Sequence, residues 1–103
     1  MNSPDFSVVV PLFNEADSVA ILQKEIFAAL EGRNYELILV DDGSTDGTIL
    51  RIERGPNVRA LQLRKNSGQS AALLVGMRAA KGESIVLLDG DLQNDPRDIP
   101  KLL

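Results

Sequence analysis

The 103-residue sequence contains neither cysteine nor histidine. The absence of cysteine excludes disulfide bonds and thiolate metal sites, and it is compatible with a reducing compartment. The absence of histidine excludes Ser-His-Asp catalysis, imidazole zinc ligands and histidine general bases. Any catalysis by this chain therefore depends on carboxylates, amides, hydroxyls, Arg, Lys or a metal ion held by oxygen ligands.

An excess of positive charge and long apolar runs are also missing. The formal net charge is −4 and the sequence pI is about 4.7, whereas a nucleic-acid-binding domain needs a basic face to neutralise phosphates. No apolar run approaches the roughly 20 residues that span a bilayer, and the N-terminus lacks the basic and apolar regions of a signal peptide. We therefore expect one soluble, cytoplasmic domain that binds no nucleic acid.

Four short segments predict β-strands. Three of them are apolar almost throughout, which is typical of strands covered on both faces in a parallel sheet; they are residues 6–10, 37–40 and 85–88. Segment 58–63 alternates more with polar residues, so we expect it at an edge of the sheet.

A helix is predicted between the first two strands. Apolar residues at steps of three and four form a single stripe, which consists of Val19, Leu22, Ile26 and Leu30. Asp17 or Ser18 is expected to cap this helix, and Gly32 is expected to end it.

Three further helical segments complete an alternating order of strands and helices. They cover residues 45–53, with Ser44 or Thr45 as N-cap, residues 67–80, and a segment that begins at Asp95-Pro96. Alternation of this kind predicts an α/β fold with a mostly parallel sheet and helices on both faces.

Polar and turn-forming residues follow each predicted strand directly. They are Pro11, Asn14 and Glu15 after the first strand, Asp41, Asp42, Gly43 and Ser44 after the second, Arg64, Asn66 and Gly68 after the third, and Asp89, Asp91 and Gln93 after the fourth. Ligands of open α/β sheets bind beyond the carboxyl ends of the strands, so these residues define one candidate rim.

Converging carboxylates raise one another's pKa unless a cation lies among them, and oxygen ligands favour Mg²⁺ or Mn²⁺ over Zn²⁺. Because a bound cation also attracts phosphate, the rim predicts a metal-bridged phosphate ligand.

Each motif also has a structural explanation when it is considered alone. Asp42-Gly43 is a common turn pair, and Ser44 or Asp46 suits a helix N-cap. Asp89 and Asp91 are more informative, because two acids directly after one strand cannot both be caps. The interpretation as a binding site depends on three acidic motifs that fall in register at three strand ends.

Four segments follow one another in an order and spacing that match a known family. They are VVVPLFNEADSV (residues 8–19), LILVDDGSTDGT (37–48), LRKNSGQSAALLVGM (63–77) and IVLLDGDLQNDP (85–96). In these segments the sequence resembles family 2 glycosyltransferases of the GT-A fold, a Rossmann-like architecture, and most closely the polyprenyl-phosphate sugar transferases of the dolichyl-phosphate mannosyltransferase and undecaprenyl-phosphate glucosyltransferase type. The resemblance implies that residues 1–103 are the nucleotide-sugar-binding N-terminal part of a GT-A domain, without the C-terminal acceptor-binding part.

The resemblance also implies a role for each rim residue. The implied nucleotide-binding residues are Pro11, Asn14, Glu15, Asp41, Asp42, Arg64, Asn66, Gly68 and Asp89. Asp89 and Asp91 match the Asp-x-Asp motif of the family, which is catalytic because it holds the metal and the nucleotide diphosphate, and Gln93 matches a further metal ligand. The implied cofactor is Mg²⁺ or Mn²⁺.

The implied reaction is inverting transfer of a sugar from a UDP- or GDP-sugar to a polyprenyl phosphate. Such an acceptor is already ionised near neutral pH and needs positioning more than a general base, while the metal stabilises the leaving diphosphate. The acceptor-positioning residues of the family would lie beyond Leu103, so we expect this chain alone to be inactive. We expect the full-length protein at the cytoplasmic face of the membrane, and we expect the chain to self-associate through apolar surface that the missing part would cover.

Other classes of protein fit the motifs less well. A sugar nucleotidyltransferase has a Gly-rich loop and a basic residue after its first strand, where PLFNE (residues 11–15) stands here. Haloacid-dehalogenase-type phosphatases and receiver domains carry their acidic residues after other strands, and the GxGxxG and GxxxxGK[ST] motifs are absent. One alternative stays open, namely a fragment that binds nucleotide, or only self-associates, without transferring a sugar.

Overall fold

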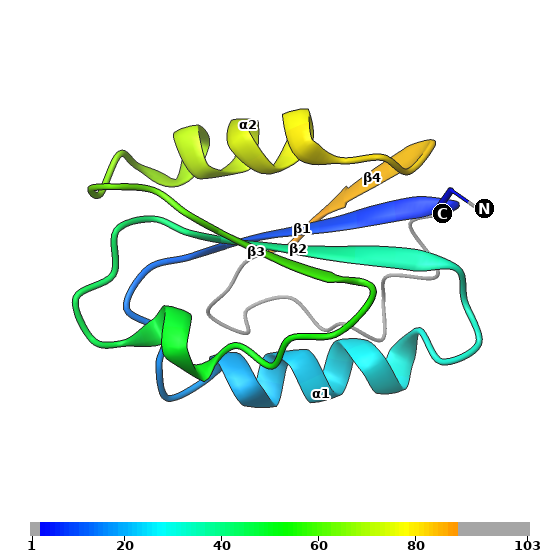
Figure 1. Cartoon of the computed structure of the whole chain (residues 1–103), viewed down its shortest axis with the longest axis horizontal. Coiled ribbons are helices and arrows are strands. Elements are labelled where there is room, and N and C mark those ends of the chain that lie inside the picture. The colour runs from blue at the N-terminus through cyan, green and yellow to red at the C-terminus, as the bar shows by residue number, and fades with distance from the viewer. Residues whose placement is uncertain (1–2, 89–103) are drawn as a thin grey trace.

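The computed structural model describes residues 3–88, which form a sheet with helices on both sides (Figure 1). Its elements are β1 (Phe6–Leu12), α1 (Val19–Ala29), β2 (Tyr35–Asp41), the 3₁₀ helix η1 (Thr48–Arg51), β3 (Val58–Gln62), α2 (Gln69–Ala79) and β4 (Ser84–Leu87). The predicted alternation of strands and helices is confirmed over these residues. The helix predicted from Asp95-Pro96 onward lies outside them.

The described strands form one parallel sheet in the order β3-β2-β1-β4. Val8 of β1 pairs with Leu37 of β2 on one side and with Val86 of β4 on the other. β1 and β2 are central and are buried along their whole length. β3 lies at an edge, as its alternating sequence predicts.

Helix α1 covers one face of the sheet. Its predicted stripe is confirmed, because Val19, Leu22, Ile26 and Leu30 are all fully buried. These side chains form one core cluster with residues of β1 and β2 that point to the same face. Burying such aliphatic side chains contributes about 1.5–3 kcal/mol each, so this layer supplies much of the stability of the fold.

Helix α2 covers the opposite face, above the sheet in Figure 1. Ala72 of this helix packs with Val9 and Val40 of the central strands. At Gly76 the helix lies so close that a Cβ atom would be 2.3 Å from Cγ1 of Val9 and 3.2 Å from Cγ2 of Val40. The small residues of α2 therefore set the distance between helix and sheet.

The predicted helix over residues 45–53 is wrong, since only η1 forms there. The expected cap Ser44 accepts the N–H of Asn14 from another loop through its Oγ. Asp46 accepts the N–H of Ala16 from that loop through Oδ2, and the N–H of Thr48 at the start of η1 through Oδ1. Gly47, with φ of 83°, then turns the chain into η1.

The prediction that 85–88 is covered on both faces is also wrong. Ile85 and Leu87 are 40% and 44% exposed. Leu87 is in register with Val9 and therefore points to the α2 face, but α2 packs over β1 and β2. Within residues 3–88, no element covers β4 on that side.

The ends of α1 differ slightly from the prediction. Ser18 is the N-cap residue, but its hydroxyl donates to Oε2 of Glu15 at 2.7 Å and makes no bond to the helix backbone. The helix ends at Ala29, and Gly32 turns the chain afterwards with φ of 81°. In the described part of the chain, no helix is long and apolar enough to cross a bilayer.

Candidate functional site

The carboxyl ends of β1, β2 and β3 lie side by side, so the loops that follow these strands meet at one rim. Asp42 N–H donates to the carbonyl of Leu12 at 2.7 Å, and Leu63 N–H donates to the carbonyl of Asp41 at 2.8 Å. The three strand ends are therefore locked in register. The structure brings together the predicted residues that follow these strands.

Asp41 ends β2 and lies at the centre of the rim. Its side chain is fully buried. The hydroxyl of Ser44 donates to Oδ1 of Asp41, and the N–H of Ser44 lies 3.4 Å from Oδ2. One oxygen of this carboxylate is thus firmly bonded, and the other makes only a long contact.

Asp42 ties the loop after β3 to the end of β2. Its carboxylate accepts the backbone N–H groups of Ser67 at 2.7 Å and Gly68 at 2.9 Å, and the side-chain amide of Asn66 at 3.1 Å. This loop also lies directly against Gly43, where a Cβ atom would be 2.4 Å from the backbone N of Asn66. Asp42, Asn66 and Gly68 are therefore neighbours, and the Asp42 carboxylate fixes the start of α2.

The loop after β1 is tied to the other side of the same segment. Asn14 N–H donates to Ser44 Oγ at 2.8 Å, and Ala16 N–H donates to Asp46 Oδ2 at 3.1 Å. Thr48 Oγ1 accepts the N–H of Glu15 at 2.9 Å. Hydrogen bonds from Thr48 and from the Ala16 backbone hold the pKa of Asp46 below its ordinary value, although partial desolvation acts in the opposite direction.

The remaining predicted rim residues differ in their accessibility. Pro11 is buried within β1, in register with Val40 of β2. Glu15 is partly buried and accepts the hydroxyl of Ser18. Arg64 is exposed beyond the end of β3. Of the predicted residues, Asn14, Arg64 and Asn66 therefore present the most surface to a ligand.

Asp46, Thr48 and Phe13 were not among the predicted rim residues, and Ser44 was predicted on the rim without a binding role. Ser44, Asp46 and Thr48 hold the loop after β1, and the signal for them is the alternating polar pattern Ser-x-Asp-x-Thr after a strand. Phe13 is 45% exposed at the same loop. A lone aromatic residue directly after a buried strand is the signal for it, because an exposed aromatic ring is costly unless it contacts something.

The predicted metal ligands Asp89, Asp91 and Gln93 lie outside the described residues. In the part of the chain that is described, no three acidic side chains come close enough together to hold a metal ion. The described residues by themselves therefore do not form the predicted metal site.

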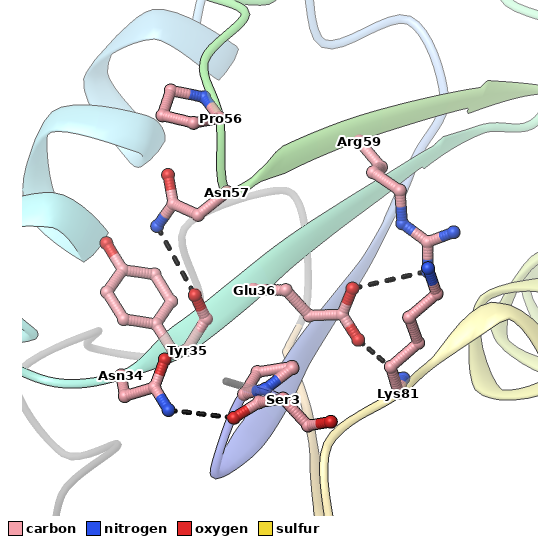
Figure 2. A pocket seen from close by; sticks show the side chains of 9 residues that line it. Ser3, Asn34, Tyr35, Glu36, Pro56, Asn57, Arg59 and Lys81 are labelled. Atoms are coloured by element: carbon pink, nitrogen blue, oxygen red, sulfur yellow. Dashed lines mark hydrogen bonds and ion pairs between the residues drawn. The ribbon is translucent and has the colours of Figure 1, made fainter. Parts of the chain in front are cut away.

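A cavity of about 450 Å³ lies at the opposite, amino end of the strands (Figure 2). At its wall, Glu36 accepts hydrogen bonds from the Ser7 hydroxyl at 2.6 Å and from the Lys81 backbone, and it pairs with Arg59 at 3.2 Å. Burial raises the pKa of Glu36, but these bonds and the Arg59 guanidinium outweigh it and leave the pKa below its ordinary value. None of the predicted site residues within residues 3–88 lines this cavity. We interpret its charged cluster as structural, because it joins β1, β2 and β3 to the segment after α2.

The parallel sheet, with helices on both faces and a hydrogen-bonded polar rim at the carboxyl ends, defines an α/β protein of the ligand-binding open-sheet class. The chain belongs to glycosyl transferase family 2, whose sequence model matches residues 7–103. The resemblance stated from the four motifs is thereby confirmed, and the phosphatase, receiver and nucleotidyltransferase alternatives are set aside.

Among curated proteins, the chain is 44% identical over 110 residues to dodecaprenyl-phosphate galacturonate synthase of Rhizobium johnstonii, with 100% of this chain and 32% of that protein covered. Among solved structures, it is similar to the mannosyltransferase PcManGT from Pyrobaculum calidifontis in complex with GDP-Man and Mn²⁺, with a TM-score of 0.80, 28% identity, and 95% of this chain and 30% of that chain covered. It is also similar to S. aureus TarS in complex with UDP, with a TM-score of 0.76, 31% identity, and 84% and 27% covered.

These neighbours confirm the predicted GT-A fold. The chain spans about a third of the length of the curated relatives that it matches.

Proposed function

We propose that this chain forms the nucleotide-sugar-binding part of a metal-dependent, inverting glycosyltransferase. The observation that supports this most directly is the rim, where the loops after β1, β2 and β3 are joined into one network around Asp41. A rim of this kind holds its polar groups in place before a ligand arrives, which lowers the entropic cost of binding.

The donor is a UDP- or GDP-sugar. The two structural neighbours are complexes with UDP and with GDP-Man, and the exposed groups of the rim suit a nucleotide. Phe13 offers an aromatic face for a base, and Arg64 offers a cation for a diphosphate. Asp41 and Glu15 stand as nucleotide contacts from the family resemblance, together with Pro11 and Asp42.

The cofactor is a divalent cation, Mg²⁺ or Mn²⁺, held by Asp89, Asp91 and Gln93. The mannosyltransferase neighbour contains Mn²⁺, and the chemistry of these oxygen ligands suits a hard cation. When bound, the cation would stabilise the negative charge on the leaving diphosphate.

The acceptor is a polyprenyl phosphate. The curated relative named above is a dodecaprenyl-phosphate synthase, and others are undecaprenyl-phosphate transferases. A phosphate acceptor is already ionised near neutral pH, so its attack needs positioning more than a general base. The site of action is the cytoplasmic face of the membrane, where such an acceptor is anchored.

A second property follows from β4. Its exposed Ile85 and Leu87 lie on one face of a strand that, within residues 3–88, pairs only with β1. An apolar strand with a free edge favours pairing with another chain, so we propose that the 103-residue chain associates with a second copy through β4.

Calorimetric titration of the 103-residue chain with UDP and with GDP, each with Mn²⁺ and with a chelator, tests the donor site. We expect one nucleotide to bind in a metal-dependent way, and Asp91→Asn to weaken that binding mainly when Mn²⁺ is present. Equal weakening in the chelator would reject the metal assignment. Binding of neither nucleotide would reject the donor site in this chain and leave the open alternative of a self-associating fragment.

A further inference from the structure

Three consecutive backbone N–H groups in the loop after β1 are all bonded to side chains of one other segment. Asn14, Glu15 and Ala16 donate to Ser44 Oγ, Thr48 Oγ1 and Asp46 Oδ2, at 2.8, 2.9 and 3.1 Å. The acceptors stand at alternate positions of one stretch, 44, 46 and 48, about 30 residues further along the chain. We call these three acceptor residues the Ser-Asp-Thr cradle.

The cradle is itself internally fixed. Asp46 Oδ1 accepts both the N–H of Thr48 at 3.0 Å and its hydroxyl, so the Thr48 oxygen is oriented to accept the N–H of Glu15. The Ser44 hydroxyl donates to Asp41 while its oxygen accepts from Asn14. The loop after β1 is thereby coupled to the buried carboxylate at the centre of the rim.

Asn14 adopts a left-handed backbone conformation, and the loop around it is held by these hydrogen bonds. Its φ is 53°, in the left-handed region that Asn tolerates better than most residues. Its side-chain Oδ1 accepts the N–H of Thr45 at 2.9 Å. A backbone N–H can only donate, so the amide oxygen of Asn14 must face Thr45. The NH₂ group is then the end of this exposed side chain that is offered to a ligand.

The cradle also determines what the loop cannot do. Because the N–H groups of residues 14–16 are already donated to side chains, they are not available to bind a phosphate in the manner of a glycine-rich loop. At residues 14–16, the donor that remains is therefore the side-chain amide of Asn14. An exposed amide NH₂, next in sequence to the exposed aromatic residue Phe13, suits the edge of a base that carries a carbonyl oxygen.

We propose that the Ser-Asp-Thr cradle is a positioning device that holds Asn14 as a hydrogen-bond donor to a carbonyl oxygen of the donor nucleotide base. This inference rests on the proposed function and assigns Asn14 to a chemical group of the ligand. Uracil and guanine carry such an oxygen, whereas adenine carries none. ADP therefore binds the rim more weakly than the preferred UDP or GDP.

Asn14→Asp is the substitution that tests the ligand contact. It keeps the oxygen that Thr45 needs and a side chain that tolerates the left-handed backbone, but it replaces the donor NH₂ with an acceptor. The matched control is Asn34→Asp, which adds the same charge at an exposed Asn near the amino-end cavity. In titrations with Mn²⁺ and whichever of UDP or GDP the wild type binds, we expect Asn14→Asp to lose at least about tenfold in affinity and Asn34→Asp to lose none.

Thr48→Val and Thr48→Ser test the cradle. Valine removes the hydroxyl at nearly constant volume, whereas serine restores it. We expect Thr48→Val to increase amide hydrogen exchange at Glu15 and to weaken nucleotide binding several-fold, and we expect Thr48→Ser to recover both. A purely structural role would lower the melting temperature of Thr48→Val without changing the affinity of the folded protein.

The outcomes separate this inference from the proposed function. If the wild type binds nucleotide and Asn14→Asp binds it equally well, the assignment of Asn14 is overturned and the donor site stands. If Thr48→Val keeps wild-type affinity, the positioning role is overturned. If the wild type binds neither UDP nor GDP, the wild-type titration alone rejects the proposed function, and the role of Asn14 falls with it.

Discussion

The carboxylate of Asp42 accepts the backbone N–H of Ser67 at 2.7 Å, across 25 residues of sequence. The same carboxylate accepts the N–H of Gly68, so two backbone donors at the start of α2 depend on one buried side chain. Asp42 therefore has a structural role, because it links the loop after β2 to the loop after β3.

Replacement of Asp42 by Ala should lower the free energy of unfolding by about 1–3 kcal/mol, because it removes the acceptor of two partly buried N–H groups and one of the two acceptors of the Asn66 amide. Urea denaturation followed by circular dichroism measures this. Ser67→Ala is the control, because among residues 3–88 the Ser67 hydroxyl donates only to the carbonyl of Lys65 in an exposed part of the loop. It should cost less than about 1 kcal/mol. Equal losses for the two variants would show that the Asp42 carboxylate is not the anchor of the loop.

Glu36 makes the stability of the fold depend on pH. Its pKa in the folded protein is lowered from the ordinary value of 4.5. A carboxyl group with a lowered folded pKa contributes stability that is fully present above its unfolded pKa and is lost as the pH falls through its folded pKa. We therefore expect Glu36→Gln to be less stable than the wild type at pH 7, and the difference to shrink below about pH 4.5.

Urea denaturation at pH 7 and at several values below 4.5 tests this expectation. Glu25→Gln, on the exposed face of α1, is the control and should leave the stability nearly unchanged at every pH. A Glu36→Gln deficit that stays constant down to pH 3 would show that the carboxylate acts through shape and not through its charge.

Most of the fold could be predicted from the sequence, because its signals are local. Continuous apolar runs mark β1 and β2, and the stripe from Val19 to Leu30 marks α1. The parallel order follows from the alternation of strands with helices. The edge position of β3 follows from its alternating residues.

The errors arise where distant contacts override local preference. The segment 45–53 has residues that suit a helix, but Asp46 and the expected cap Ser44 accept hydrogen bonds from the loop after β1, which only the folded sheet brings near. The apolar run at 85–88 predicts two-sided burial, yet α2 packs on the neighbouring strands. In both cases the deciding neighbour, the loop after β1 or helix α2, lies outside the short segment from which the helix or strand was predicted.

The sequence predicted which residues lie at the candidate site, but not the hydrogen bonds that connect them. Strand ends identify Asn14, Asp41 and Asn66 as rim residues, because the carboxyl ends of parallel strands share one edge. The hydrogen bonds that couple them run through hydroxyls of Ser44 and Thr48, whose pairing depends on rotamers and loop shape. Sequence spacing alone does not specify such pairings.

Gly76 is expected to be intolerant of a side chain although it lies within a helix. Alanine favours helix over glycine by about 1 kcal/mol, but a Cβ atom here would lie 2.3 Å from Cγ1 of Val9. Overpacking of this kind costs about 1–3 kcal/mol, so we expect Gly76→Ala to be destabilising overall. Thermal unfolding measures the effect. Ser70→Ala, at an exposed position of the same helix, is the control and should be neutral or slightly stabilising; a stabilising Gly76→Ala would mean that α2 moves away from the sheet at little cost.

If two copies of the chain associate through β4, one charged substitution on this strand should separate them. Leu87 is 44% exposed and lies on the α2 face, in register with Val9. Lysine on an edge strand opposes pairing with another strand, so Leu87→Lys should convert a dimer or larger assembly into a monomer of 11.2 kDa. Size-exclusion chromatography with light scattering measures this. Leu50→Lys is the control, since Leu50 is 86% exposed on η1, away from β4, and should leave the assembly intact. Dissociation by both variants would point to a general effect of charge, and a monomeric wild type would show that β4 tolerates its exposed side chains without a partner.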